Sequence, residues 1–486
     1  MKITNLRWIA FIAIFAVMLM ASCTDDEPTP EPIVEQPDEI TFTDPLLLAQ
    51  VKLALGLGAD EDVNEENILE LEELNIDAED DLTGELSGIA SLEGLEFAEN
   101  LTYLRFGGTA VTDLSPIADL EKIEYLRFND TDITDISPIS NYTTLTYFNA
   151  NTVTGLTDIS PLAGNTGIKE IILRDVPFGN DGMATIANFT NMYRINMRGS
   201  GVTDLTVLGE LMADGALLDT TPGAADAGGA DIDLRGLSIT NWLPILPYVS
   251  EITTIDGMPS NDPVSVPDSR LALQIKLALG VSEEVELTTL YMLSLTELNL
   301  DGEDDLSANG DIREISDLTG LEHAENITYL RFGATAVTDI SPIAGLTKVE
   351  YLRFNDTGIT DISALSGYTT LTYFNANSVS GITDISPLAG NTGIKEIILR
   401  EVPFGNAGMA TIRNFTNMYR INMRSTGVTD ITVLGELMEA GALLDSTEGA
   451  EEAGGADLDL RGLSIEDWSP IEPFLDQISN IEGYSN

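Results

Sequence analysis

A repeated stretch constrains the fold of this chain more than any other feature. Leu101 to Leu120, LTYLRFGGTAVTDLSPIADL, aligns with Ile123 to Tyr142, IEYLRFNDTDITDISPISNY, and apolar residues coincide at a spacing of 22 residues. Looser copies begin at Leu145, Ile168, Met192 and, after an insertion, Ile232. A fixed period in the twenties predicts a solenoid, because one unit cannot bury its apolar face alone and must stack on its neighbours.

Within one unit, the pattern predicts a short strand followed by a turn. Side chains alternate along a strand, so Leu104 and Phe106 are expected to point into the core, and Tyr103 and Arg105 to the opposite face. The segment Asp113 to Pro116 favours a capped helical turn, because Asp and Ser cap helix starts and Pro suits the first position. The expected core residues of the unit are Leu101, Leu104, Phe106, Val111, Leu114 and Ile117.

The repeat, with TDISPL after the strand, resembles the bacterial, internalin-type leucine-rich repeat. The resemblance covers most of Leu46 to Asn486. It implies an α/β solenoid with a parallel sheet on the concave side and short 3-10 or irregular turns on the convex side. It also implies that the concave face meets a macromolecular partner.

The chain carries this arrangement twice. From the Leu101 region onward, residue n matches residue n+226, so that Thr157 to Arg174 is identical to Thr383 to Arg400. Each half begins with an amphipathic helix after an Asp, and this start resembles the N-terminal cap of such proteins. A continuous stack needs no cap in its middle. We therefore predict two separately capped domains, 44–258 and 268–486, joined by a linker at 259–267; the alternative is one continuous stack that absorbs the second cap.

One segment interrupts the period in each half. It is GALLDTTPGAADAGG at Gly215 to Gly229, and its counterpart is Gly441 to Gly455. Its glycines and small residues predict a loop, which we interpret as a tolerated surface insertion, the alternative being a functional excursion.

The N-terminal segment indicates secretion. Lys2 and Arg7 precede an apolar run from Trp8 to Met20, and small residues lead to Cys23, the only cysteine. This predicts a signal peptide over 1–22, because the run is short for a membrane-spanning helix. Cys23 resembles the lipidated cysteine of bacterial lipoproteins, and the acidic residues after it resemble the surface-export signal of Bacteroidota lipoproteins. Residues 23–43 are acidic and rich in proline, which predicts an extended tether. The resemblance implies an outer-membrane lipoprotein exposed on the cell surface.

The charge of the chain limits its partners. With 80 acidic and 23 basic residues, the formal net charge is −57. Such a charge disfavours nucleic acid and anionic membrane surfaces as partners. We therefore expect membrane contact only through the lipid anchor.

Catalysis is not indicated. The single histidine, His323, takes the place of Phe97 in the first copy, so we expect it to cover the edge of an apolar core. Without a second histidine or cysteine, the usual nucleophile and base pairs are missing, and we predict no enzymatic activity and no cofactor. Two acidic clusters are interpreted as solvated loops rather than calcium sites: Asp77, Glu79, Asp80 and Asp81, and Asp301, Glu303, Asp304 and Asp305.

The predicted concave face is rich in residue types typical of binding surfaces. In the first copy these are Tyr103, Arg105, Tyr125, Arg127, Tyr147, Asn149, Arg174, Arg194, Asn196, Arg198 and Arg235. The second copy keeps each of them as Tyr329, Arg331, Tyr351, Arg353, Tyr373, Asn375, Arg400, Arg420, Asn422, Arg424 and Arg461. Adhesion to a protein of a host or neighbouring cell is the first hypothesis. The alternatives are a glycan ligand, an envelope spacer without a specific ligand, and arginines that only neutralise neighbouring acids.

Overall fold

The computed structural model describes residues 38–81, 84–302 and 312–484. Within them, the chain forms two parallel sheets of eight strands, each in chain order. The first sheet comprises β1 (Glu73–Asn75), β2 (Tyr103–Arg105), β3 (Tyr125–Arg127), β4 (Tyr147–Asn149), β5 (Glu170–Ile172), β6 (Arg194–Asn196), β7 (Asp231–Asp233) and β8 (Thr254–Asp256). The second comprises β9 (Glu297–Asn299), β10 (Tyr329–Arg331), β11 (Tyr351–Arg353), β12 (Tyr373–Asn375), β13 (Glu396–Ile398), β14 (Arg420–Asn422), β15 (Asp457–Asp459) and β16 (Asn480–Glu482). This confirms the predicted two-part leucine-rich-repeat solenoid.

The core follows the predicted alternation. All six expected core residues of the Leu101–Leu120 unit are fully buried. Equivalent residues stack from unit to unit: the rings of Phe106 and Phe128 lie 5.7 Å apart and nearly parallel, and Phe148 meets Phe128 edge-on at 5.4 Å. Because burial of each such side chain contributes about 1.5–3 kcal/mol, the stack itself stabilises the fold.

The turns after the strands are capped as predicted. In the first, a 3-10 helix covers Ser115–Ile117, and the backbone N–H and hydroxyl of Ser115 donate to Asp113 at 2.8 and 2.7 Å. Pro116 lies at the start of this turn, where its missing N–H removes no bond. The same aspartate-to-serine bond recurs in the next unit, between Ser137 and Asp135 at 2.7 Å.

A helix precedes each sheet, at the predicted place. In α1 (Pro45–Leu55), Asp44 accepts from the N–H groups of the first turn, and Gly56 ends the helix at φ 70°. In α4 (Ser269–Leu279), Asp268 caps the start in the same way. The remaining helices are α2 (Met183–Ile186), α3 (Thr206–Ala213), α5 (Thr289–Leu293), α6 (Gly405–Ile412) and α7 (Thr432–Glu439).

The insertion at 215–229 is not a simple surface loop. Ala216 and Leu217 are fully buried, and the N–H of Leu217 donates to the carbonyl of Met192 at 2.6 Å. Asp219 accepts from two backbone N–H groups, those of Ala230 and Thr253, at 2.8 and 3.0 Å. The interpretation as a tolerated surface insertion is therefore corrected: the segment folds back and packs its apolar residues against the solenoid.

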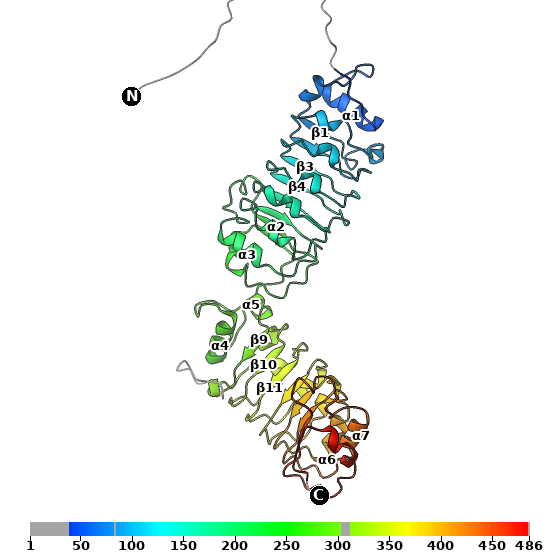
Figure 1. The fold of residues 1–486 in the computed structure, drawn as a ribbon. Helices are drawn as coiled ribbons and strands as arrows, with labels where there is room; N and C mark the ends of the chain where they lie inside the picture. Colours follow the sequence, from blue (N-terminus) through cyan, green and yellow to red (C-terminus); the bar gives the residue numbers. More distant parts are fainter. Residues whose placement is uncertain (1–37, 82–83, 303–311, 485–486) are drawn as a thin grey trace, which may run out of the picture.

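The two halves meet end to end, with α5 at the junction (Figure 1). Leu290 of α5 is fully buried and belongs to the hydrophobic core of the first half. Trp242, which is only 3 % exposed, belongs to the same core. The backbone N–H of Trp242 donates to the Ser294 hydroxyl at 2.9 Å. The second cap thus contacts the first solenoid directly, in addition to the covalent connection, while the domain boundaries at 258 and 268 stay predictions.

Candidate functional site

The tyrosines of β2, β3 and β4 form a stacked column on the concave face. The rings of Tyr103 and Tyr125 lie 4.3 Å apart, and those of Tyr125 and Tyr147 lie 4.0 Å apart and almost parallel. The second copy repeats the column with spacings of 4.4 and 4.1 Å. Each ring covers a face of its neighbour, so the column offers mainly ring edges and hydroxyls to a partner.

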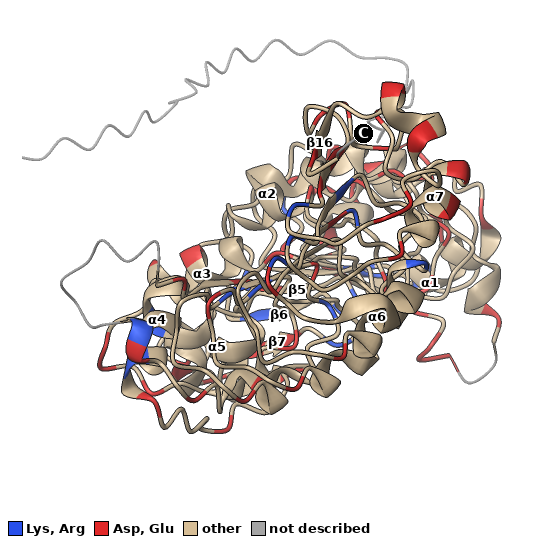
Figure 2. Ribbon diagram, turned by 90° about the horizontal axis from the view of Figure 1, so that it is seen from below, with Lys and Arg blue, Asp and Glu red and all other residues tan. Residues whose placement is uncertain are grey.

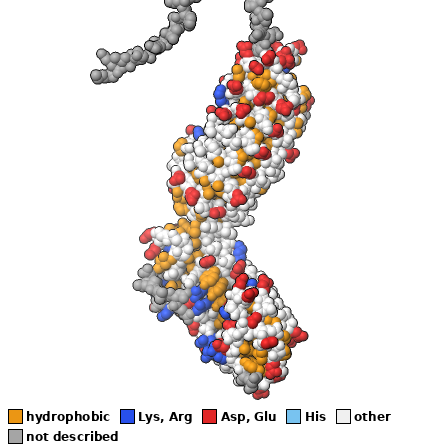
Figure 3. Space-filling view, in the orientation of Figure 1, with side chains coloured by type: hydrophobic (Ala, Val, Ile, Leu, Met, Phe, Trp, Pro, Cys, Tyr) orange, Lys and Arg blue, Asp and Glu red, His pale blue; other side chains and the backbone are white. Residues whose placement is uncertain are grey.

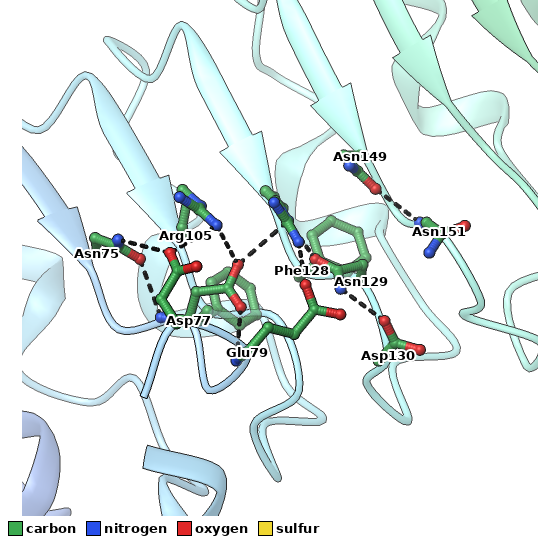
Figure 4. Close-up of polar contacts among 12 residues, drawn as sticks. Asn75, Asp77, Glu79, Arg105, Phe128, Asn129, Asp130, Asn149 and Asn151 are labelled. Carbon is green, nitrogen blue, oxygen red and sulfur yellow. Dashed lines mark hydrogen bonds and ion pairs between the residues drawn. The ribbon is translucent and has the colours of Figure 1, made fainter. Parts of the chain in front are cut away.

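The two arginines of β2 and β3 serve a buried carboxylate. The side chain of Asp77 has no exposed surface, and one of its oxygens pairs with Arg105 at 3.0 Å and with Arg127 at 3.2 Å. Figure 4 shows Arg105 beside Asp77, which follows β1 in the chain. In the second copy, Arg331 and Arg353 pair with Asp301 at 2.8 and 3.1 Å. For these four arginines, neutralisation of a buried aspartate therefore explains the position better than a role in a free binding surface does.

The asparagines of β4 and β12 are less accessible than predicted. Asn149 is only 8 % exposed; its amide donates to the Tyr147 hydroxyl at 3.1 Å, and its oxygen accepts from the N–H of Asn151 at 2.9 Å. Asn375 has the same burial and equivalent bonds. The prediction that they offer binding groups is corrected, since both ends of the side chain are used within the repeat.

Arg194 lies in a chain of alternating charges across three strands. It pairs with Glu170 on one side at 2.7 Å and with Asp231 on the other at 3.1 Å. The Tyr193 hydroxyl also donates to Glu170 at 2.8 Å. Burial and this carboxylate together raise the pKa of Tyr193 to about 12. Arg420 is held in the same way in the second copy, at 2.8 and 3.1 Å.

Three further arginines form a column just after β5, β6 and β7. Arg174, Arg198 and Arg235 each follow a buried core residue, and backbone bonds join their turns: Asp175 N–H donates to the Arg198 carbonyl, and Gly199 N–H to the Arg235 carbonyl. Adjacent strands place such neighbours about 4.8 Å apart. The corresponding residues of the second copy are Arg400, Arg424 and Arg461.

The middle arginine of this column differs from the others. Each of its two neighbours has a carboxylate partner, Asp175 at 3.2 Å and Asp233 at 2.6 Å. Within the described residues, Arg198 has no carboxylate within 4.0 Å of its guanidinium, and neither has Arg424. The same position therefore carries an arginine without an ion pair in both copies.

Sequence reasoning missed an apolar residue on this face. Ile172 lies between Glu170 and Arg174, on the same side of the strand, and is partly exposed. In the sheet it is flanked by Asn149 and Asn196, and Ile398 repeats it. The signal that could have found it is the strand alternation itself. In Figure 2, several Lys and Arg segments lie on the strands around β5 and β6 and others on α4, while Asp and Glu lie on loops, helices and strands alike.

The single histidine and the two acidic clusters are the other residues that the sequence offers for chemistry. His323 ends a 3-10 helix (Leu321–His323) and is exposed, while Leu321 and Ala324 cover the core. The expectation that it covers the core edge is therefore wrong, because the helical turn directs its neighbours inward instead. Among the described residues, no group of three or more His, Cys, Asp or Glu side chains is placed to hold a metal ion. Of the acidic clusters, Glu303, Asp304 and Asp305 lie outside the described residues.

The predicted anchor also lies outside the described residues, which begin at residue 38. Cys23, the signal peptide 1–22, the tether up to residue 37 and the location at the outer membrane therefore stay predictions. Residues 38–43, the end of the predicted tether, are described and pack on the first cap: Ile40 is 6 % exposed, and its N–H donates to the Val63 carbonyl at 2.9 Å. In the part of the chain that the structure covers, none of the helices has both the length and the apolar content to cross a bilayer. Acidic side chains are scattered over the face seen in Figure 3 and form no single patch there.

Comparison with known proteins gives similarity only to solved structures. No protein-family profile and no curated protein sequence matches the chain. An internalin from Listeria monocytogenes is 23 % identical, with 83 % of this chain and 96 % of that chain covered and a TM-score of 0.36. A leucine-rich-repeat protein from Leptospira interrogans is 13 % identical, covering 86 % and 97 %, with a TM-score of 0.30. The functional domain of InlJ from Listeria monocytogenes is 18 % identical, covering 81 % and 77 %, with a TM-score of 0.24. The 22-residue repeats and the two parallel sheets of eight strands make the fold of this chain a leucine-rich-repeat solenoid in two parts.

Proposed function

We propose that this protein is a non-enzymatic, lipid-anchored surface protein whose two concave faces bind a protein partner. The observation that carries the proposal is the repetition of one partly exposed face in both halves. The tyrosine columns of the two halves agree in ring spacing within 0.1 Å, 4.3 and 4.0 Å against 4.4 and 4.1 Å. The arginine column and the apolar residue beside it are also repeated.

Tyrosine at these positions contributes little that the core requires. The core is filled by the alternate residues of each strand, which are fully buried. Tyrosine provides a large contact area at low entropic cost, and it is enriched in protein interfaces. Two such faces on one chain increase the effective local concentration for a partner with two sites.

A protein partner fits the tyrosine column better than a glycan does. A sugar ring binds by stacking on an open aromatic face, but the inner face positions of this column are occupied by neighbouring tyrosines at 4.0–4.4 Å. The ring edges, the hydroxyls and the outer faces of the two end rings remain, and this mixture suits the polar and apolar surface of a polypeptide.

The test is a double substitution, Tyr125→Ala with Tyr351→Ala, assayed on a protein array and a glycan array. We expect signals on the protein array with the wild-type chain and their loss, by about tenfold or more, with the variant. Arg127 and Arg353 are left in place, because removing them would disturb the buried Asp77 and Asp301.

Phe97→Ala is the matched control, since Phe97 is an exposed aromatic residue outside the concave column. Retention of the array signals in the tyrosine variant would refute the concave-face proposal. Signals on the glycan array alone would favour the glycan hypothesis. No signal on either array would favour an envelope spacer without a specific ligand.

The anchor is tested separately. Cys23→Ser removes the thiol that would carry the lipid, so we expect the variant to move from the membrane fraction to the soluble fraction. Fractionation with immunoblotting measures this, and Ser22→Ala provides the control. A Cys23→Ser protein that stays with the membranes would exclude lipidation as the anchor.

A further inference from the structure

The concave surface around β5 and β6 has the composition of a specific contact site. We define the central patch as Ile172, Arg174, Asn196 and Arg198, with Ile398, Arg400, Asn422 and Arg424 in the second copy. We infer that the central patch takes a polypeptide segment carrying an acidic side chain beside an apolar one. This inference rests on the proposed function, because it assigns a partner chemistry to the same face.

The first argument is the arginine that lacks an ion pair. Of the six concave arginines in each half, five have a carboxylate within about 3.3 Å, whereas Arg198 and Arg424 have none among the described residues. An exposed arginine without a partner is ordinary in most proteins. Here the chain holds 80 acidic and 23 basic residues, yet at one structural position of both copies the guanidinium forms no ion pair, and its charge reaches Asp233 or Asp459 only from beyond 4.0 Å.

The second argument is the chemistry of the available donors. A guanidinium presents a planar fork that matches a carboxylate, and such charge-assisted bonds are shorter and stronger than neutral ones. In the first copy the amide nitrogen of Asn196 has no bond partner among the described residues, while its oxygen accepts from the N–H of Arg198 at 3.1 Å. A carboxylate at this point of the first copy would therefore meet donors from two neighbouring side chains. In the second copy the amide of Asn422 already donates to Asp459 at 3.0 Å, so Arg424 is the available donor there.

The third argument is the apolar centre. Ile172 is partly exposed on a face whose other positions on β4 to β6 are polar, aromatic or charged. Energetic centres of protein interfaces combine a desolvated apolar contact with a surrounding polar ring. Closing a partner over Ile172 excludes water from Arg198, and this strengthens an ion pair formed there.

The net charge sets a further condition on the partner. At −57 the chain repels acidic proteins at long range. The acidic side chain is therefore expected within a segment of a neutral or basic protein. Salt screens the long-range repulsion while a partly desolvated local pair is screened less.

The test is the selection of peptides from a random phage-displayed library against the whole chain without its signal peptide. We expect enrichment of peptides with Asp or Glu next to an apolar residue. Arg198→Gln with Arg424→Gln should weaken the binding of these peptides by about tenfold or more. Replacing the carboxylate of the peptide by an amide should weaken binding to the wild type to the same extent, and should have little further effect on the variant.

Arg413→Gln is the matched control, because Arg413 lies at the end of α6, outside the concave face, and pairs with Glu436. Ile172→Ser with Ile398→Ser reports whether selected peptides bind the central patch at all. Peptides that require Ile172 and Ile398 but neither the two arginines nor an acidic residue would overturn this inference and leave the proposed function standing. Peptides bound elsewhere, or no enrichment, would count against both.

Discussion

At the scale of single residues, the concave arginines divide by their surroundings. Arg105 and Arg127 neutralise Asp77, whose side chain is completely buried, and Arg194 bridges two carboxylates. Arg198, like Arg424 in the second copy, has no carboxylate within 4.0 Å among the described residues. The sequence placed all of them on one face but did not distinguish them, because the carboxylate that claims the first two lies 28 residues or more away in the chain.

The buried carboxylate leads to a stability prediction. Asp77→Ala removes the carboxylate that two arginines share. We expect the free energy of unfolding of the first half to fall by about 2–4 kcal/mol. This loss is slightly smaller than for a fully buried ion pair, because both arginines are partly exposed. Urea unfolding followed by circular dichroism measures the change.

Asp80→Ala is the control for Asp77→Ala. The Asp80 side chain is 54 % exposed and also pairs with Arg105 at 3.0 Å, so its loss should cost less than about 1 kcal/mol. Equal losses for the two variants would show that burial of Asp77 does not determine its contribution.

At the scale of elements, the repeat is held by strand stacking on one side and by capped turns on the other. Strands of three residues are too short to be stable alone, and each depends on its neighbours for backbone partners. The turns are fixed locally, since hydrogen bonds from the side chain and N–H of Ser115 lower the pKa of Asp113. Bonds from Ser or Thr two residues on lower the pKa of other turn aspartates in the same way: Asp135, Asp204, Asp384, Asp430 and Asp467.

These turns predict the response to acid. A carboxyl whose folded-state pKa is lowered stabilises the fold above its unfolded value, near 3.9, and this contribution is lost as the pH falls through the folded-state pKa. Between pH 7 and about 5, partial protonation instead relieves the repulsion of a net charge of −57. We expect the melting temperature to rise from pH 7 to about 5 and to fall below about pH 4.

Thermal unfolding followed by circular dichroism across this pH range measures both effects. Added salt at pH 7 should reproduce the rise, because it screens the same repulsion. A melting temperature that falls steadily from pH 7 downward would contradict the idea that repulsion among the acidic side chains destabilises the fold at pH 7.

At the scale of the whole molecule, the two halves differ where they meet. The end of the first solenoid carries Leu246, where the second has the charged Glu472. In the second cap, Leu290 and Tyr291 pack against the first half, where the first cap has Glu66 and Asn67. Apolar residues therefore occur at these positions only in the copies that face each other, which indicates a specific junction.

Restoring the first-cap residues should open this junction. We expect Leu290→Glu with Tyr291→Asn to separate the halves while each keeps its own core, because the first cap folds with these same residues. Small-angle scattering should show a broader distribution of distances, and one thermal transition should become two.

Leu53→Ser is the control for the junction variant, since Leu53 is 73 % exposed on α1, away from the junction. An unchanged scattering profile in the junction variant would show that the contact of α5 does not fix the arrangement of the halves.

The sequence by itself determined the period, the inward residues, the caps and the duplication, because each depends on local pattern or on identity between copies. Leu104 and Phe106 were assigned correctly from alternation, and Asp44 and Asp113 from capping preferences. The tertiary structure alone decided which arginines are already neutralised, that Asn149 is enclosed, and that Leu290 completes the core of the other half. These facts depend on contacts between units distant in the chain, and burial and ion pairing are set by what the stacked neighbours supply.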